Sequence, residues 1–139
     1  MDGRAFLNSA RHLLTIPSEE NWRSASGRAY YALLHEGRIF LDRWGFPIPP
    51  RETLHSFVRL RFTFPAHADL KRIGQTVEQL NRLRNQGDYH LAAPGRFASD
   101  RDARWAITIA QGSIDLLDTI DVDPTRRTAA IAAIHAAWS

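Results

Sequence analysis

Apolar residues recur at three- and four-residue spacing along most of the chain, which is typical of helices with one buried face. Five stretches keep this period, at about 2–14, 18–44, 51–62, 66–86 and 100–121. Asp123-Pro124 then opens an Ala-rich helix at about 124–138. No stretch alternates like a strand, and no repeat or second domain is visible. We therefore predict one all-α domain over residues 1–139, an antiparallel bundle of four to five helices.

The helix predicted at 100–121 is apolar on two sides, so it needs cover on both. Neighbouring helices can cover one side, and a second copy of the chain can cover the other. The helix start at Ser99-Asp100-Arg101-Asp102 resembles a capping box, with Asp102 in the usual Glu position. The apolar residues of the first side are Ala103, Ala106, Ile107, Ala110, Ile114 and Leu117, and those of the second are Trp105, Ile109, Leu116 and Ile120.

The apolar face of the helix predicted at 66–86 has an arginine, Arg84, as its last residue. Its stripe of Ala66, Leu70, Ile73, Val77 and Leu80 continues to position 84. A buried guanidinium is costly unless it is paired or used. Gly87 predicts the helix end, because glycine readily takes the left-handed C-cap conformation. A loop at 88–98 should follow, with Arg96 and Phe97 exposed or half-exposed.

Two motifs in this order resemble those of the HEPN domains. Arg84-Asn85 followed by His90 resembles their Arg-x(4–6)-His motif, and the run from Arg28 to His35, RAYYALLH, resembles the "AYYAMFH" helix of a prokaryotic branch. Leu83 to Tyr89 also fits that branch's Leu-Arg-x-x-Ala-Asp-Tyr, with Gly87 in place of Ala. The resemblance covers about residues 5–120. It implies a HEPN-like helical bundle that forms a two-fold dimer, with both motifs in one composite cleft.

The residue types of this motif suit metal-free cleavage of RNA. The 2′-OH attacks the adjacent phosphorus, a base accepts its proton, an acid protonates the leaving oxygen, and a cation stabilises the charge. His90 can transfer protons near neutral pH, Arg84 can stabilise charge, and Asn85 can orient either group. Positions 84 and 90 would point about 120° apart on a straight helix, so they converge only if the helix stops at Gly87. One His per chain is short of two proton carriers, and a dimer would supply a second.

Further residues are candidates for binding the RNA substrate. A polar stripe of Arg28, Tyr31, His35, Arg38 and Asp42 follows the second predicted helix. It is either a solvated outer face or a seam toward a ligand or partner, in which Tyr31 and His35 could both reach a phosphate. Antiparallel packing would bring the dipole of the helix at 100–121 to the same end as His90. The candidates for substrate binding are therefore Tyr31, His35, Tyr89, Arg101 and Arg104.

Composition narrows the class of protein. The net charge is only +3, yet Lys71 is the one lysine among 18 basic residues. Arginine suits bidentate phosphate contacts, although a codon bias would also explain its excess. Cysteine is absent, which excludes disulfides and thiolate zinc sites. We expect no metal, no cofactor, no membrane span and no signal peptide, hence a cytoplasmic protein.

The sequence leaves three functions open. The first is a HEPN-type endoribonuclease, the toxin of a prokaryotic toxin–antitoxin or defence system. The second is a non-catalytic HEPN module that binds nucleotide, RNA or a protein, and the third is a helical interaction subunit. In a structural alternative, Arg84 pairs with Asp88 and His90 is a solvated loop residue. Some toxins of the wider group carry, two residues after the His, a tyrosine that a partner nucleotidyltransferase modifies. Ala92 holds that position here, which puts this kind of antitoxin in doubt.

Overall fold

The protein is built entirely of helices in the part that the structure describes. The structure is a computed structural model, and it describes residues 2–91 and 95–139. No strand occurs in these two ranges, so the predicted all-α class is confirmed for them. The elements are α1 (Gly3–Leu13), α2 (Glu19–Arg43), η1 (Arg51–Thr53), α3 (Leu54–Thr63), α4 (Ala68–Tyr89), η2 (Gly95–Phe97), α5 (Arg101–Val122) and α6 (Pro124–Ala137).

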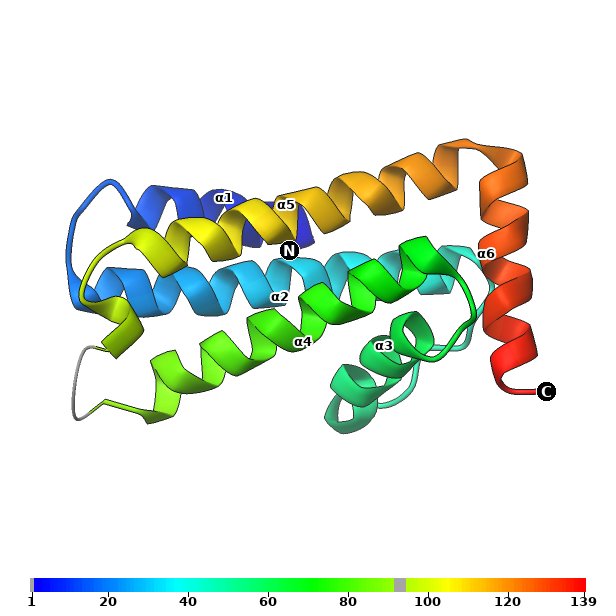
Figure 1. Ribbon diagram of the computed structural model, residues 1–139, viewed down its shortest axis with the longest axis horizontal. Helices are drawn as coiled ribbons and strands as arrows, with labels where there is room; N and C mark the ends of the chain where they lie inside the picture. Colours follow the sequence, from blue (N-terminus) through cyan, green and yellow to red (C-terminus); the bar gives the residue numbers. More distant parts are fainter. Residues whose placement is uncertain (1, 92–94) are drawn as a thin grey trace.

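Four helices lie side by side in a bundle, with α2 packed against α1, α4 and α5 (Figure 1). The chain runs in opposite directions in α1 and α2, and again in α4 and α5 (Figure 1). As a result, the end of α4 and the start of α5 lie at the same end of the bundle. That part of the predicted arrangement is confirmed. The helices α3 and α6 lie at the other end, outside the four-helix bundle.

The core follows the predicted apolar stripes. Along α2 the stripe of Ala25, Ala29, Leu33 and Leu41 is fully buried. The helix α4 packs against α2, and its residues Leu70, Ile73, Val77 and Leu80 are buried too. The first side of α5 is buried as predicted. On its second side Ile120 is buried, whereas Trp105, Ile109 and Leu116 are only partly covered within one chain. No helix among the described residues is long and apolar enough to cross a membrane.

The end of α4 differs from the prediction. The helix does not stop at Gly87 but continues to Tyr89, and His90 is its C-cap residue. Gly87 is needed for packing instead, because a Cβ there would meet the Phe97 ring at 3.3 Å and the Arg23 carbonyl oxygen at 3.4 Å. The glycine therefore allows α4 to approach α2 and η2 closely. Gly87 is therefore required because it has no side chain. Its backbone does not adopt the left-handed conformation that favours glycine.

The segment before α5 also differs from the prediction. Phe97 is buried, with 2% of its surface exposed, and the guanidinium of Arg23 lies 4.8 Å from its ring centroid. The expectation of an exposed or half-exposed Phe97 is therefore wrong. The capping box is wrong too, because the Asp102 carboxylate accepts two hydrogen bonds from Arg96. Ser99 Oγ accepts from the backbone N–H of Arg101 at 3.3 Å.

Candidate functional site

Arg84 lies at the centre of the candidate site, on the side of α4 that faces α2. Its guanidinium carbon is 5.3 Å from the ring centroid of Tyr30 and 5.2 Å from that of Tyr31. Its Nη1 donates to Asn81 Oδ1 at 3.4 Å. Its Nε lies 3.4 Å from Asp88 Oδ2, but the geometry of this ion pair does not make a hydrogen bond, and the buried Nε has no hydrogen-bond acceptor among the described residues. The predicted pairing with Asp88 is thus present, and it leaves this donor unsatisfied.

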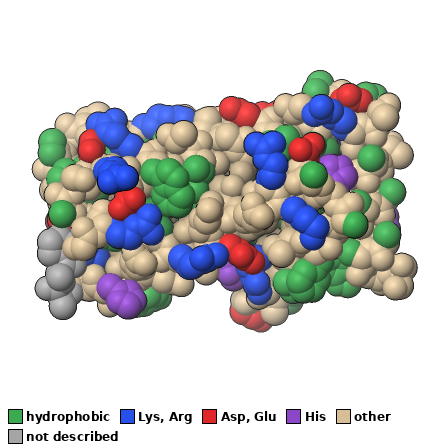
Figure 2. All heavy atoms as spheres, viewed as in Figure 1, with side chains coloured by type: hydrophobic (Ala, Val, Ile, Leu, Met, Phe, Trp, Pro, Cys, Tyr) green, Lys and Arg blue, Asp and Glu red, His purple; other side chains and the backbone are tan. Residues whose placement is uncertain are grey.

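A pocket of about 720 Å³ opens beside Arg84, between α2, α3 and α4. Figure 2 shows the molecule hollowed at its lower edge, between α4 and α3. The lining contains three arginines and two histidines but no Asp or Glu, so the pocket favours an anion. The lining residues are Tyr30, Tyr31, Leu34, His35, Arg38, Ile48, Pro49, Arg51, Leu54, His55, Asn81, Arg84 and Asn85.

His55 is held in this pocket by Tyr30. The Tyr30 hydroxyl of α2 and His55 Nδ1 of α3 are hydrogen-bonded to each other. Burial lowers the pKa of His55, and the positive charges of Arg59 and Arg84 lower it further. Burial raises the pKa of Tyr30 well above its ordinary value, which keeps the hydroxyl protonated. His55 is therefore a neutral imidazole in a fixed position at neutral pH.

His35 lies among aromatic rings on α2. Its ring stacks on Phe6 of α1 with centroids 5.2 Å apart, and its centroid is 6.3 Å from that of Tyr31. Burial lowers the pKa of His35, and Arg38 and Arg51 add to this effect. The stripe that contains Tyr31, His35 and Arg38 is half-buried, and these three side chains line the pocket. Two predicted substrate-binding residues are thus brought together with Arg84.

His90 and Tyr89 lie elsewhere. His90 is an exposed C-cap residue, and it does not line the pocket that contains Arg84 and Asn85. Tyr89 is 71% exposed and lines a different depression, together with Glu19, Glu20 and Asp88. Since α4 stays helical through Gly87, the turn that would have made positions 84 and 90 converge within one chain is absent. The two halves of the sequence motif therefore occupy different surfaces of one chain.

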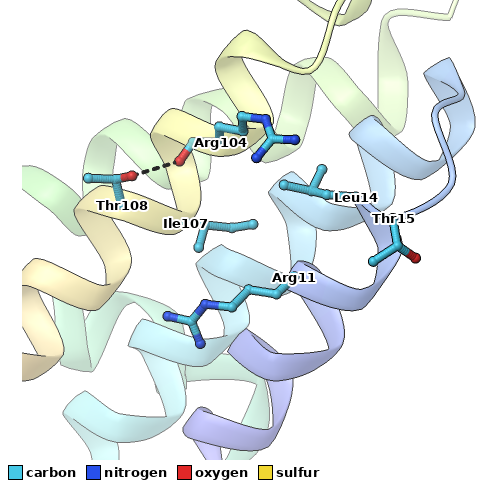
Figure 3. A pocket seen from close by; sticks show the side chains of 6 residues that line it. All are labelled: Arg11, Leu14, Thr15, Arg104, Ile107 and Thr108. Atoms are coloured by element: carbon cyan, nitrogen blue, oxygen red, sulfur yellow. Dashed lines mark hydrogen bonds between the residues drawn. The ribbon is translucent and has the colours of Figure 1, made fainter.

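Arg101 and Arg104 lie at the start of α5, as predicted, but both are exposed. Arg104 forms an ion pair with Asp100, and its side chain lines a cavity of about 520 Å³ between α1 and α5. Figure 3 shows that Arg11, Leu14 and Thr15 come from the end of α1, opposite Arg104, Ile107 and Thr108. Arg104 therefore belongs to a separate cavity, and Arg101 lines neither this cavity nor the pocket around Arg84. At this end of the bundle, Asp102 pairs with Arg96 and Asp100 pairs with Arg104.

Sequence reasoning missed several residues of the site. These residues are Tyr30, Arg51 and His55. They come from three separate segments, and no local pattern indicates that these segments meet. Arg38 also lines the pocket, and its position on the polar stripe of α2 is the one sequence pattern that indicated such a role.

Ala92, the position of the modified tyrosine in some toxins, lies outside the described residues. Within those residues, no group of three or more His, Asp or Glu side chains is arranged to hold a metal ion.

Comparison of the chain with protein-family models, with curated proteins and with solved structures finds no match. The resemblance to HEPN domains therefore stays a prediction, based on the two motifs themselves.

Proposed function

We propose that this chain is a metal-independent endoribonuclease of HEPN type, in which Arg84 binds and stabilises the scissile phosphate of RNA. One observation carries the proposal. The Arg84 guanidinium lies over two tyrosine rings, in a pocket whose lining includes Arg38 and Arg51 but no carboxylate. A planar guanidinium is suited to phosphate, because it can present two parallel N–H groups to the phosphate oxygens.

In the proposed reaction the 2′-oxygen of RNA bonds to the adjacent phosphorus, and the bond from phosphorus to the 5′-oxygen breaks. A base takes the 2′-OH proton, and an acid gives a proton to the leaving 5′-oxygen. The products are a 2′,3′-cyclic phosphate and a 5′-OH end. Arg84 stabilises the charge that develops on the non-bridging oxygens, and Asn85, next to it in the pocket lining, orients the phosphate.

His90 is the proton carrier that the sequence motif suggests. Because it is exposed and outside the pocket of its own chain, it can act there only if a second chain brings it. A two-fold dimer is the arrangement that would do so, and we propose it as the HEPN resemblance implies. The proposed cellular role is that of a toxin in a toxin–antitoxin or defence system, with an antitoxin as its partner.

The experiment is incubation of the purified protein with total RNA in the presence of EDTA. We expect fragments with cyclic phosphate ends. Arg84→Ala should lower the cleavage rate by about 10²–10³-fold, the typical loss for one charge-stabilising donor. Arg82→Ala is the matched control, because Arg82 lies on the same helix but 71% of its side chain is exposed.

Two results would count against the proposal. Cleavage that stops in EDTA would contradict the metal-free reaction, and full activity of Arg84→Ala would remove Arg84 from the site. Binding of RNA by the wild-type protein without any cleavage would instead favour a non-catalytic HEPN module.

A further inference from the structure

The pocket around Arg84 contains two imidazoles that the sequence motif does not include. His35 comes from α2 and His55 from α3, and both line the same cavity as Arg84 of α4. The reaction needs one group to accept a proton and another to donate one. The sequence offered one histidine per chain for this purpose, at His90. The folded chain offers two beside the arginine.

We propose that His35 and His55 transfer the two protons of RNA cleavage, and that one chain contains the complete catalytic set. The inference rests on the proposed ribonuclease function and names further catalytic residues for it. It keeps RNA cleavage at Arg84 but assigns proton transfer to His35 and His55 in place of His90. The base, the acid and the charge-stabilising arginine then all belong to one pocket, and no second chain is needed.

The side chains are held in place by contacts that do not depend on substrate. The hydrogen bond between the Tyr30 hydroxyl group and Nδ1 fixes the His55 ring. In the tautomer in which Nδ1–H donates to the Tyr30 oxygen, Nε2 carries no proton and can accept one. The rings of Tyr30 and Tyr31 are 5.3 Å apart, and Tyr31 in turn lies beside His35. A chain of four rings therefore connects His55 to His35, with Arg84 over the two central rings. Such support is what a preorganised site requires.

The charges around the two histidines also suit the reaction. Among the described residues, the charged groups that act on them are Arg38 from α2, Arg51 from η1, Arg59 from α3 and Arg84 from α4. These cations and burial lower both pKa values, so the free protein holds neutral imidazoles ready to act as bases. A bound phosphate adds negative charge beside them, which favours protonation of one ring. That ring becomes the acid.

The proton balance is complete without any other reactant. One neutral imidazole takes the 2′-OH proton as the bond from the 2′-oxygen to phosphorus forms. The other, as imidazolium, gives its proton to the 5′-oxygen as the bond to phosphorus breaks. Each histidine ends in the state in which the other began, and solvent exchange restores both.

The first test compares His35→Ala and His55→Ala with His12→Ala, in which an exposed histidine of α1 is changed. We expect each of the first two to lower kcat by about 10²–10⁴-fold, with KM changed less. Free imidazole should restore part of the activity of each variant, because it can enter the space left by the ring. A loss caused by misfolding is not restored by imidazole. Wild-type kcat in either variant, or no rescue in a variant with a native circular dichroism spectrum, overturns the proposal.

The second test asks whether the groups act within one chain. Arg84→Ala and His55→Ala proteins are unfolded together, refolded as a mixture and assayed. We expect no recovery, because each chain lacks one group of the same pocket. Recovery to about a quarter of wild-type activity, the fraction of intact sites that random pairing of the chains into two-fold dimers gives, would show that the groups come from different chains and would overturn the inference.

Failure of the proposed function and failure of this inference alone give different results. If the wild-type protein does not cleave RNA, the proposed function fails and this inference fails with it. If the wild-type protein cleaves and the His35 and His55 variants cleave equally well, only this inference fails.

Discussion

Arg23 Nη1 donates a hydrogen bond to the backbone carbonyl of His90, at 3.0 Å, across 67 positions of sequence. The same nitrogen also lies 3.1 Å from the Gln86 carbonyl oxygen and 3.2 Å from that of Gly87. The last carbonyls of a helix have no partner within the helix. A buried arginine of α2 thus caps α4, and it fixes the position of the segment that contains Arg84 and His90.

The first prediction concerns this cap. Arg23→Gln should lower the free energy of unfolding by about 1–3 kcal/mol, because the shorter glutamine loses the guanidinium bonds to one buried and two partly buried carbonyls. Arg101→Gln, at an exposed position of α5, is the control and should change it little. Urea unfolding followed by circular dichroism measures both. Equal stability of the two variants would show that Arg23 is not needed to hold the end of α4.

Helix boundaries were predictable where the signal lies within one turn. The Ser18 side chain accepts from the backbone N–H of Asn21, and Asp123 accepts from those of Thr125 and Arg126, as residues of these types do at N-caps. The end of α4 was not predictable in this way. Gly87 is a local stop signal, but here the cap comes from Arg23 and the glycine is used for close packing. The end of α4 is therefore determined by contacts between residues that are distant in sequence.

The same limit explains what could be predicted of the candidate site. Arg84, Asn85, Tyr31 and His35 were identified from two helical motifs, and all four line one pocket. His55 was not assigned to it, because nothing near His55 in sequence indicates that α3 packs beside Tyr30. The predicted position of His90 depended on where α4 ends. Because α4 continues past Gly87, His90 does not lie beside Arg84 within one chain.

A second prediction uses two glycines in helix interiors. A Cβ at position 74 would lie 2.9 Å from the Thr63 backbone nitrogen and 3.0 Å from the Phe62 carbonyl carbon. Gly74→Ala should therefore force α3 and α4 apart and destabilise the protein by about 1–3 kcal/mol. A Cβ at position 112 meets nothing within 4 Å, so Gly112→Ala should stabilise by up to about 1 kcal/mol. The midpoint of thermal unfolding measures both effects. If Gly74→Ala and Gly112→Ala shifted it in the same direction, the result would contradict this packing.

The third prediction concerns pH and stability. Burial lowers the pKa values of His35 and His55 below the ordinary 6.5, so the folded protein binds fewer protons than the unfolded chain. The free energy of unfolding should then be highest above about pH 6.5 and fall as the pH decreases through the lowered pKa values. In His55→Gln this fall should be smaller, since the variant has lost one of the two groups. Urea unfolding across this range provides the measurement, and an unchanged pH dependence in the variant would contradict the assignment.

The fourth prediction concerns the two-fold dimer. The second side of α5 leaves Ile109 and Leu116 partly covered, beside a groove of about 350 Å³ between α4 and α5. If a second chain covers this side, Leu116→Lys should shift sedimentation from dimer to monomer while the helical content stays the same. Val122→Lys is the control on α5, because Val122 is 80% exposed near the end of the helix. A wild-type protein that is monomeric at micromolar concentration would contradict the dimer.

The last prediction asks whether Arg84 acts by its shape as well as by its charge. The flat guanidinium lies over Tyr30 and Tyr31 at 5.3 and 5.2 Å, and it can present two parallel N–H groups to a phosphate. A lysine ammonium is a point charge and reproduces neither feature. Arg84→Lys should therefore lose nearly as much cleavage activity as Arg84→Ala, about 10²–10³-fold.

Arg82→Lys, on the exposed face of α4, should keep full activity and serves as the matched control. Asn85→Ala should lose less activity than either Arg84 variant, because the amide only orients the phosphate and carries no charge to stabilise it. Single-turnover cleavage of a defined RNA in EDTA separates these rates from binding. If Arg84→Lys were as active as the wild type, charge alone would suffice at position 84. The contact of the guanidinium with the two tyrosine rings would then have no part in the reaction.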